Sequence, residues 1–492
     1  MAGIGVKLNR IFSKNTITTS LVGFGYSSAI TIAPMCLIIT TIIIMQRLLG
    51  FTKLGYAVRE LFACTVLYIF IFALLTSSPF NAVLSRYLSD VIYEETYDDI
   101  LPCFFTGLIL NILLSCLVGI PFCVFEYLAG EVALFYVFAG YCGYVALVLV
   151  FYSMLYLSIC KDYNKISLFF LIGMLTAVIL SLVLVYLGRV ETTFAMLASL
   201  DTGFVLIACL ELALIKSYFR KNSGKYKIVF RYLGKYWQLI ATNFLYTLGL
   251  FIHNFVFWTT DMRIVVAGSF VCATPYDMAT CLAMFTNLSA SVIFITRVEM
   301  HFHERYRKYS EAVIGGRGND IANTKKRMFY QLSEELMNLV RLQFIVSVVL
   351  YFACIILLPQ FGFGGMVIRI YPCLAAGYFI LFIMYSAIIF LYYFNDLNGS
   401  VMTSLGFCLV TLLGSICAAR LSPIWYGIGL VAGAMTGWCI AYCRLRNMER
   451  NLDIHVFCEG NILKKGHGKP PSGQVYSNPF PAAKRKRKIH LL

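Results

Sequence analysis

One segment of the chain, RVEMHFHERYRKYSEAVIGGRG, gathers histidine and glutamate side chains that could bind a metal ion. It begins at Arg297 and includes Glu299, His301 and His303. Zinc sites use histidine and carboxylate ligands that converge on one point. His301 and His303 would lie about 200° apart on a helix, where they cannot hold one ion together. Glu299 and His303 share a helical face, but this pair is an incomplete zinc site, so we expect a solvated interfacial helix instead.

The glycines that close this segment could cradle a phosphate group. Phosphate-binding loops follow a strand and end in Lys-Ser or Lys-Thr. The sequence GGRG, from Gly315 to Gly318, has neither feature. Glycine tolerates the left-handed backbone conformation that often terminates helices, so we expect a helix to end here.

Polar side chains inside apolar runs form a second group of candidates. Ionisable residues are costly in the hydrocarbon core of a membrane, so those found there are candidates for a transport pathway. The pathway candidates are Asn111, Asp201, Glu211, Asn243, His253, Asn254 and the helix-breaking Pro34.

The sequence leaves the roles of these candidates open. Asp201 could couple transport to an ion or make a buried structural contact. His253 could act in the pathway or be an interfacial neighbour of Trp258. Pro34 could open its helix toward a cavity or cause a simple packing kink.

An acidic segment, SRYLSDVIYEETYDDILP, lies between Ser85 and Pro102 and interrupts the basic trend of the chain. Its charged residues are Arg86, Asp90, Glu94, Glu95, Asp98 and Asp99. Such a loop could simply be solvated, or it could dock a basic cytoplasmic partner. Arg297 and Glu299 complete the candidate docking surface.

Composition shows what kind of scaffold must position these residues. Hydrophobic residues make up 60% of 492 positions, charged residues 13%, and the mean hydropathy is +0.79. A soluble chain would carry about twice that charged share. We therefore predict an all-α, multi-pass membrane protein surrounded by the lipid bilayer.

Twelve apolar runs are long enough to cross a membrane as helices. They cover about 21–46, 61–84, 101–125, 131–160, 167–188, 193–215, 237–258, 279–297, 342–359, 367–394, 400–419 and 422–443. Most of the 40 Lys and Arg residues fall in the segments that face the cytoplasm if both termini are inside. The positive-inside rule therefore predicts an N-in, C-in orientation. This bias accounts for much of the net charge of +16, so no nucleic-acid partner is expected.

The basic segment 216–236 divides the predicted spans six and six, so we expect lobes at 1–215 and 237–443. The second lobe includes a cytoplasmic loop, 298–341. Within this loop, the periodic apolar residues from Met328 to Leu339 predict a helix along the membrane surface before the ninth span. The tail 444–492 is basic and rich in Pro and Gly, and we expect it to be disordered.

Catalytic constellations are missing from the sequence. It contains no nucleotide-binding loop, no zinc ligand set and no nucleophile beside a base. The seventeen cysteines include no CxxC pair, and most stand alone in apolar runs, as small buried hydrophobes do. We expect a transporter, not an enzyme, and no cofactor.

Five segments together resemble the Pel exopolysaccharide exporter (PelG) family. They are MAGIGVKLNRIF at the start, SRYLSD from Ser85, FVFW from Phe255, the RVE…GG pattern from Arg297, and YYFNDLNG from Tyr392. The resemblance implies a twelve-helix fold like that of multidrug, oligosaccharidyl-lipid and polysaccharide exporters, with two lobes around a central cavity. It also implies an Asp-Lys pair before the FW segment, where this chain has His253 and Asn254.

The same resemblance implies a substrate and partners. The substrate would be a polysaccharide rich in N-acetylgalactosamine, made by a cytoplasmic glycosyltransferase and regulated through a membrane partner that senses cyclic di-GMP. Three other functions fit the same architecture: a lipid-linked oligosaccharide flippase, a cation-coupled drug antiporter, and a scaffold for the synthase that transports nothing. A flippase for pyrophosphate-linked lipids should carry several Arg or Lys inside its spans, and this sequence has almost none there.

Overall fold

The computed structural model describes residues 17–130, 132–160, 162–287, 302, 304–357, 359–360 and 365–454, with side chains from Ala33 onward. The chain divides into two compact units, Met1–Leu445 and Arg446–Leu492, and the first holds nearly all the described structure.

Ten helices in the described part of the chain are long and apolar enough to cross a membrane. They are α3 (Tyr56–Tyr93), α4 (Ile100–Ala129), α5 (Leu134–Ile159), α6 (Tyr163–Tyr186), α7 (Thr192–Tyr218), α9 (Trp237–Phe257), α12 (Gly318–Leu357), α13 (Gly365–Tyr393), α14 (Leu397–Ala418) and α15 (Ile428–Ile454). Ten of the twelve predicted spans fall on these helices. The first falls on α2 (Ile17–Leu48) and the eighth begins in α10 (Thr274–Asn287), and both extend into residues or side chains outside the described set.

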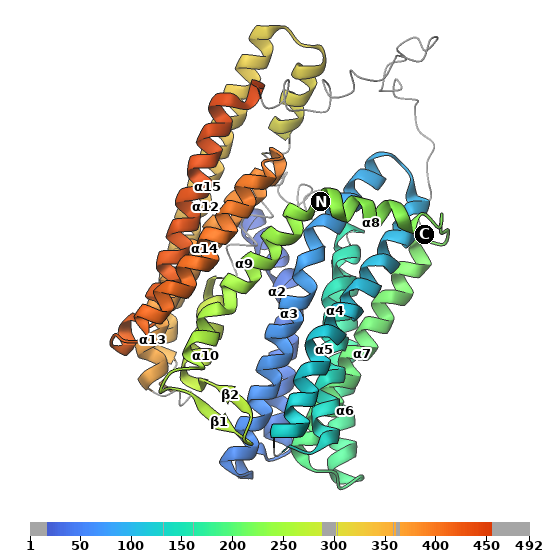
Figure 1. The fold of residues 1–492 in the computed structure, drawn as a ribbon, viewed down its shortest axis with the longest axis vertical. Helices are drawn as coiled ribbons and strands as arrows, with labels where there is room; N and C mark the ends of the chain where they lie inside the picture. The colour runs from blue at the N-terminus through green and yellow to red at the C-terminus, as the bar shows by residue number, and fades with distance from the viewer. Residues whose placement is uncertain are drawn as a thin grey trace. The chain divides into compact units, whose positions relative to one another are not determined.

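Two clusters of buried hydrophobic side chains organise the unit Met1–Leu445. The first contains residues from Ile38 to Leu239, contributed by α2 to α9. The second contains residues from Phe251 to Ala434 and a single earlier residue, Ile71 of α3. The two groups meet where α3 packs against α9 (Figure 1).

Pairs of glycines bring helices into backbone contact within each group. A Cβ added to Gly203 of α7 would lie 2.9 Å from the carbonyl oxygen of Gly173 in α6. Similarly, a Cβ on Gly414 of α14 would lie 2.9 Å from the Cα of Gly429 in α15. Small residues allow such close approach, which is the main source of helix packing energy in a membrane.

Helices continue beyond two of the predicted apolar runs. The segment after Ser85 is the end of α3 up to Tyr93, with a short 3₁₀ turn η2 at Tyr97–Asp99, and is not an extended loop. The predicted tail from residue 444 begins as the last part of α15.

The predicted surface helix is also wrong, because α12 runs unbroken for 40 residues from Gly318 to Leu357. Its apolar face is buried by protein: Met328 and Leu339 are almost fully covered, and Phe329 stacks on Phe394 at a ring distance of 5.2 Å. The apolar periodicity was real, but it marked a helix–helix contact.

Two of the segments that carry the family resemblance pack against each other at this end of α13. The ring of Phe302 lies 5.4 Å from Tyr393, and the ring of Tyr306 lies 5.9 Å from the same residue. The pattern of aromatic residues in both segments therefore has a structural cause.

The described part of the opening histidine segment is helical over residues 304–315 and ends before Gly316, as predicted. The physical reason differs from the expected one, because neither Gly315 nor Gly316 has a positive φ. His301, His303, Arg297 and Glu299 lie outside the described residues.

A short antiparallel hairpin between α9 and α10 was not predicted. Its strands are β1 (Ile264–Val266) and β2 (Phe270–Cys272), and Gly268 takes a left-handed φ of 80° in the turn. Three-residue strands are too short to produce a clear alternating pattern in the sequence.

The contact between Gly173 and Gly203 predicts a sharp sensitivity to side-chain size. Replacing Gly203 by Ala should destabilise the protein by about 1–3 kcal/mol, since the new methyl group must push two helix backbones apart. A lowered melting temperature of the purified protein in detergent would show this. Gly234→Ala is the matched control, because a Cβ there meets no atom within 4 Å. An equal effect of the two substitutions would contradict the packing argument.

Candidate transport site

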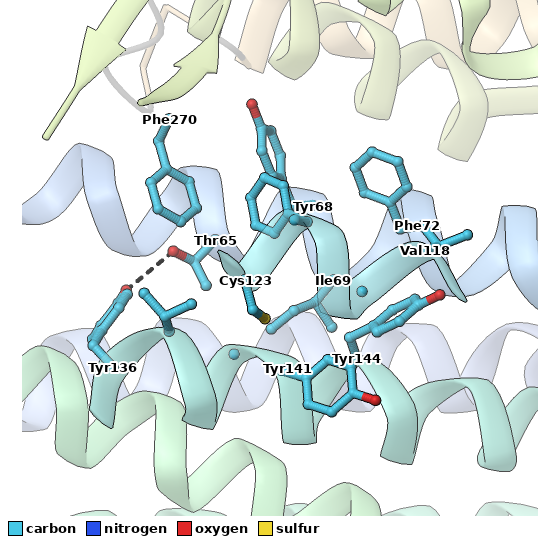
Figure 2. Close-up of a pocket in the computed structure, with 14 residues that line it drawn as sticks. Thr65, Tyr68, Ile69, Phe72, Val118, Cys123, Tyr136, Tyr141, Tyr144 and Phe270 are labelled. Carbon is cyan, nitrogen blue, oxygen red and sulfur yellow. Dashed lines mark hydrogen bonds between the residues drawn. The ribbon is translucent and has the colours of Figure 1, made fainter. Parts of the chain in front are cut away.

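A cavity of about 280 Å³ lies among α3, α4 and α5 and is covered by the hairpin (Figure 2). The lining residues are Thr65, Tyr68, Ile69, Phe72, Val118, Gly119, Phe122, Cys123, Tyr136, Val137, Gly140, Tyr141, Tyr144 and Phe270. Its volume is close to the lower end of the range for small-molecule sites.

The cavity is built mainly from aromatic rings and contains no charged lining residue. Half of its lining residues are Tyr or Phe, so it offers flat apolar faces with a few hydroxyl groups at their edges. The Tyr136 hydroxyl donates to Thr65 Oγ1 at 3.2 Å, and the Tyr144 hydroxyl lies 2.6 Å from Thr76 Oγ1. Such a lining suits a neutral ligand with apolar faces and hydroxyl groups.

The hairpin borders this cavity through Phe270 and contacts both groups of helices. The Tyr68 hydroxyl donates to the carbonyl oxygen of Val271 at 2.5 Å and accepts from its N–H at 3.1 Å. The Tyr68 ring also stacks on Trp258 at 5.0 Å. Phe270 of β2 meets Phe122 of α4 edge to face at 5.8 Å. Tyr68 and Phe122, which line the cavity, thus also contact the hairpin.

Two polar contacts fix the ends of this cover. Thr274 Oγ1 donates to Glu60 Oε2 at 2.9 Å, and the Ser269 hydroxyl donates to the Glu126 carboxylate. Each contact links the segment around the hairpin to α3 or α4.

The candidates His253 and Asn254 belong to a buried polar cluster beside the hairpin. Asn254 Nδ2 donates to Asp277 Oδ1 at 2.7 Å, and Trp258 Nε1 lies 3.0–3.1 Å from both Asp277 oxygens. The backbone N–H of Ala273 donates to Asp277 Oδ2 at 2.9 Å. Asp277 thus accepts hydrogen bonds from every side, and Asn254 supplies one of them.

Asp277 is a residue that the sequence analysis missed. It lies just before the predicted eighth span, where an acidic residue in a loop attracts no notice. The signal that could have found it is the sequence TPYD at Thr274, because a Pro near the start of a helix and an acid in its first turn mark a helix N-terminus.

His253 is fully buried within the protein. Its Nδ1 lies 2.8 Å from the Tyr276 hydroxyl and its Nε2 lies 3.5 Å from the Tyr378 hydroxyl. The imidazole therefore connects α9 with α10 and α13.

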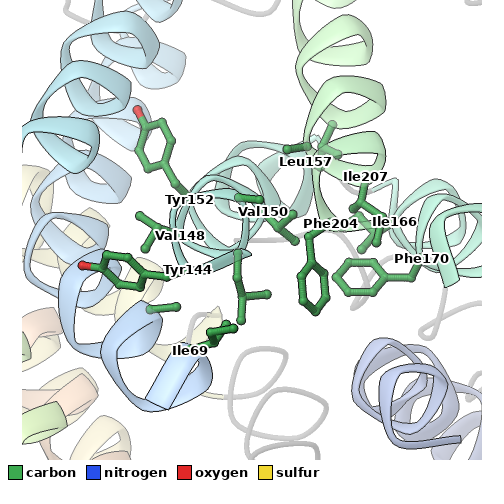
Figure 3. Close-up of a cluster of buried hydrophobic side chains, with 14 of the residues drawn as sticks. Ile69, Tyr144, Val148, Val150, Tyr152, Leu157, Ile166, Phe170, Phe204 and Ile207 are labelled. Atoms are coloured by element: carbon green, nitrogen blue, oxygen red, sulfur yellow. The ribbon is translucent and has the colours of Figure 1, made fainter. Parts of the chain in front are cut away.

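The two buried carboxylates of α7 are in a different situation. Asp201 is 6% exposed and Glu211 is fully buried, and neither carboxylate accepts a hydrogen bond within the described part of the chain. Their helix packs in an apolar core, where Phe204 lies near Phe170 of α6 (Figure 3). Asp201 Oδ1 would lie 2.0 Å from a Cβ on Gly143, so only glycine at that position leaves room for the carboxylate.

The remaining pathway candidates make helix contacts. Asn243 Nδ2 donates to the Ser78 carbonyl at 3.2 Å and its Oδ1 accepts from the Tyr392 hydroxyl at 3.3 Å, so it joins α3, α9 and α13. Asn111 Nδ2 donates to a carbonyl of its own helix. Helix α2 continues through Pro34, so the proline does not unwind its helix. None of the seven pathway candidates lines the cavity described above.

The acidic docking candidates are partly covered by the chain's own basic linker, which forms helix α8 (Tyr226–Lys235). Lys225 Nζ lies 3.2 Å from Asp99 Oδ2, and the Tyr232 hydroxyl donates to Asp90 Oδ2 at 2.5 Å. Burial and the bond to Asp90 raise the pKa of the Tyr232 phenol, so it remains a neutral donor. Asp90 and Asp99 therefore hold the linker in place.

The other members of this docking set divide into engaged and free groups. The Arg86 guanidinium lies 4.3 Å above the Tyr236 ring, so it too faces the linker. Glu94, Glu95 and Asp98 are exposed. These three carboxylates are therefore open to a partner.

An ion pair between Asp396 and Arg444 explains part of the YYFNDLNG segment. Asp396 caps α14 by accepting from the Gly399 N–H at 3.0 Å, and Arg444 of α15 binds both its oxygens at 2.8 and 2.6 Å. A Cβ on Gly399 would lie 2.3 Å from Asp396 Oδ2, so glycine is required there. This motif anchors two helices to each other.

Comparison with known proteins adds a family and a fold. A family profile matches residues 1–457, and it describes PelG, an exopolysaccharide exporter (EPS-E). No curated protein sequence shows significant similarity to the chain.

Several solved transporters share the fold at low sequence identity. An outward-facing multidrug resistance MATE family transporter of the MOP superfamily superposes with a TM-score of 0.57 at 14% identity, over 87% of this chain and 96% of that one. Its inward-facing conformation gives 0.56 at 12% identity, over 80% and 91%. A MOP superfamily transporter from Pyrococcus furiosus, described with a binding pocket of reversed polarity, gives 0.57 at 12%, over 87% and 96%.

The cluster around Asp277 predicts a specific stability effect. Trp258→Phe keeps an aromatic ring at this position but removes the indole N–H that lies near both Asp277 oxygens. The free energy of unfolding should fall by about 1–3 kcal/mol, because a buried carboxylate loses a hydrogen-bond donor. The melting temperature in detergent measures this loss. Trp425→Phe is the control, since that side chain is 51% exposed. Equal melting temperatures for wild type and Trp258→Phe would show that the hydrogen bond contributes nothing.

Proposed function

Because the family profile covers residues 1–457, the chain belongs to the PelG exopolysaccharide exporter family, and on this premise we propose that it exports a Pel-like polysaccharide. It is a multi-pass membrane transporter with the fold of MOP superfamily members. The proposed substrate is rich in N-acetylgalactosamine, and the proposed path crosses the bacterial cytoplasmic membrane.

We propose that the transporter consists of two six-helix lobes, 1–215 and 237–443, joined by the basic linker 216–236, with both termini in the cytoplasm and a cytoplasmic tail at 444–492. The two separate hydrophobic clusters support this division. So do the equivalent glycine contacts, which join the fifth and sixth helices of the first lobe and the last two helices of the second.

The observation that carries the proposal is the aromatic, uncharged cavity. Sugar rings present apolar C–H faces and hydroxyl edges, so they pack well against aromatic rings that also carry hydroxyl groups. A volume of about 280 Å³ accommodates on the order of one sugar unit. We propose that the cavity holds one unit of the polymer when the hairpin closes the outer side.

The proposed site at which a proton or cation drives opening is the pair of unsatisfied carboxylates on α7. A buried carboxylate without a partner is costly, and a proton or a cation would relieve that cost. Asp201 lies directly behind α5, which lines the cavity, so a change at its carboxylate is transmitted to the cavity wall through Gly143.

Cytoplasmic partners are expected at the exposed part of the acidic segment and at the loop 298–341. The exposed side chains Glu94, Glu95 and Asp98 could dock a basic surface of the glycosyltransferase or of the partner that senses cyclic di-GMP. The other proposed docking residues, Arg297 and Glu299, lie outside the described set.

One alternative function has specific support from the cavity. Aromatic faces attract organic cations, so a drug antiporter would also fit this lining. Overexpression would then protect cells from cationic dyes, whereas a polysaccharide exporter would not change dye resistance.

Filling the cavity should block export. A Cβ on Gly140 meets only Thr65 Cγ2, at 3.4 Å, so Gly140→Leu can fold while placing its side chain among the lining residues. In a polymer-producing host that lacks the gene, this variant should restore roughly ten-fold less secreted polymer than wild type, as expected for a binding loss of about 1.4 kcal/mol.

Gly55→Leu is the matched control, because a Cβ there meets no atom within 4 Å. Membrane abundance of each variant must be equal for the comparison. If deleting the gene leaves secreted polymer unchanged, the proposed function is wrong. If Gly140→Leu exports normally, the cavity is not on the path.

Neutralising Asp201 tests ion coupling separately. Asp201→Asn keeps the shape of the side chain but removes its charge and its proton site, so polymer export should fall about ten-fold or more at equal protein abundance. Ser199→Ala, two residues earlier on the same helix, removes only a local hydroxyl contact and serves as the control. Full export by Asp201→Asn would mean that this carboxylate has only a structural role.

A further inference from the structure

Helix α8 has three distinct faces, although it is only ten residues long. One face docks on the first group of helices, where Val229 and Leu233 are almost fully buried. On this side Lys225 and Tyr232 contact Asp99 and Asp90. The other two faces are exposed.

The first exposed face is a basic stripe. Lys227, Arg231 and Lys235 follow one another at intervals of four residues, so they line one side of the helix. All three are exposed, and no carboxylate in the described part of the chain forms an ion pair with them. Lys235 Nζ lies 5.0 Å from the centroid of the Tyr236 ring.

The second exposed face is aromatic. Tyr226 and Phe230 lie four residues apart on α8, and Trp237 follows at the start of α9; the three side chains are 37%, 52% and 56% exposed. Large aromatic side chains left uncovered beside a basic stripe are typical of helices that lie in a membrane interface. Trp and Tyr in particular concentrate at the level of the lipid headgroups.

The direction of α8 fits this setting. In Figure 1 it runs across the ends of the neighbouring membrane helices, whereas α7 before it runs along them. A helix in that orientation lies parallel to the membrane surface at the end of the spans.

We propose that α8 is an interfacial helix that binds anionic phospholipids. The basic stripe contacts the phosphate groups, and the aromatic flank enters the boundary between headgroups and acyl chains. The inference rests on the proposed orientation, which places the linker in the cytoplasmic leaflet, where anionic lipids attract basic segments. An acidic protein partner would match the stripe but would leave the aromatic flank in water.

Because of where α8 lies in the chain, lipid bound to it would affect the connection between the two groups of helices. The helix joins α7 to α9, and hence one hydrophobic cluster to the other. Lipid bound to its outer faces and carboxylates bound to its inner face hold the linker from two sides.

Native mass spectrometry of the full chain in detergent, titrated with phosphatidylglycerol or phosphatidylcholine, tests the basic stripe. The wild type should prefer phosphatidylglycerol. The triple variant Lys227→Gln/Arg231→Gln/Lys235→Gln should bind it roughly 100-fold more weakly, about five-fold for each cation. The control Lys326→Gln/Arg327→Gln/Arg341→Gln removes the same charge from exposed sites on α12 and should retain the preference. Equal losses in both triple variants, or no loss in the first, would overturn the proposal.

A second measurement tests the aromatic flank. In vesicles containing phosphatidylglycerol and bromine-labelled phosphatidylcholine, tryptophan emission should be quenched, and Trp237→Phe should remove a quenched component. If the component lost is unquenched, Trp237 lies in water and α8 binds an acidic protein instead, which overturns the proposal. Neither assay measures export, so failure of the lipid site and failure of the proposed function are distinguishable.

Discussion

The structure depends on one constraint: hydrocarbon offers no water to satisfy a polar group. Most polar side chains within the described spans therefore bond to a nearby carbonyl of their own helix. Examples are Thr106, Ser115, Ser199 and Thr403, each bonded to the carbonyl four residues earlier. With polar groups satisfied locally, the helices can pack through small residues, and the contacts of Gly173 with Gly203 and of Gly414 with Gly429 follow.

The few contacts between the two hydrophobic clusters matter more for motion than the contacts within each cluster, because they must change if the clusters move apart. They include the packing of α3 on α9, the bonds of Asn243 and the attachment of the hairpin to Tyr68. A hairpin held by single hydrogen bonds and ring contacts separates more easily than two helices in glycine contact. Motion is therefore expected at the hairpin, while each cluster stays intact.

Long apolar runs made most of the helices predictable from the sequence, because length and hydropathy alone decide whether a helix can span. Features that depend on tertiary contacts were not predictable. The apolar face of α12 looks the same in sequence whether a membrane or Phe394 covers it. Asp90 and Asp99 gave the pattern of a free acidic loop, although Tyr232 and Lys225, more than a hundred residues away, contact them. The hairpin and Asp277 lie in a segment without periodicity.

The buried carboxylates of the two clusters differ in their hydrogen-bond partners. This difference decides which cluster can respond to a change of charge. Asp277 accepts hydrogen bonds from Trp258 and Asn254, and Asp396 accepts from Arg444, so both carboxylates have partners. Asp201 and Glu211 have no such partners among the described residues. A satisfied carboxylate stabilises one arrangement of its helices. An unsatisfied one instead favours any rearrangement that brings it a proton, a cation or water, because such a partner lowers the free energy of the protein. The first cluster, which also contains the cavity, is therefore the part of the molecule in which binding and helix movement are most easily coupled.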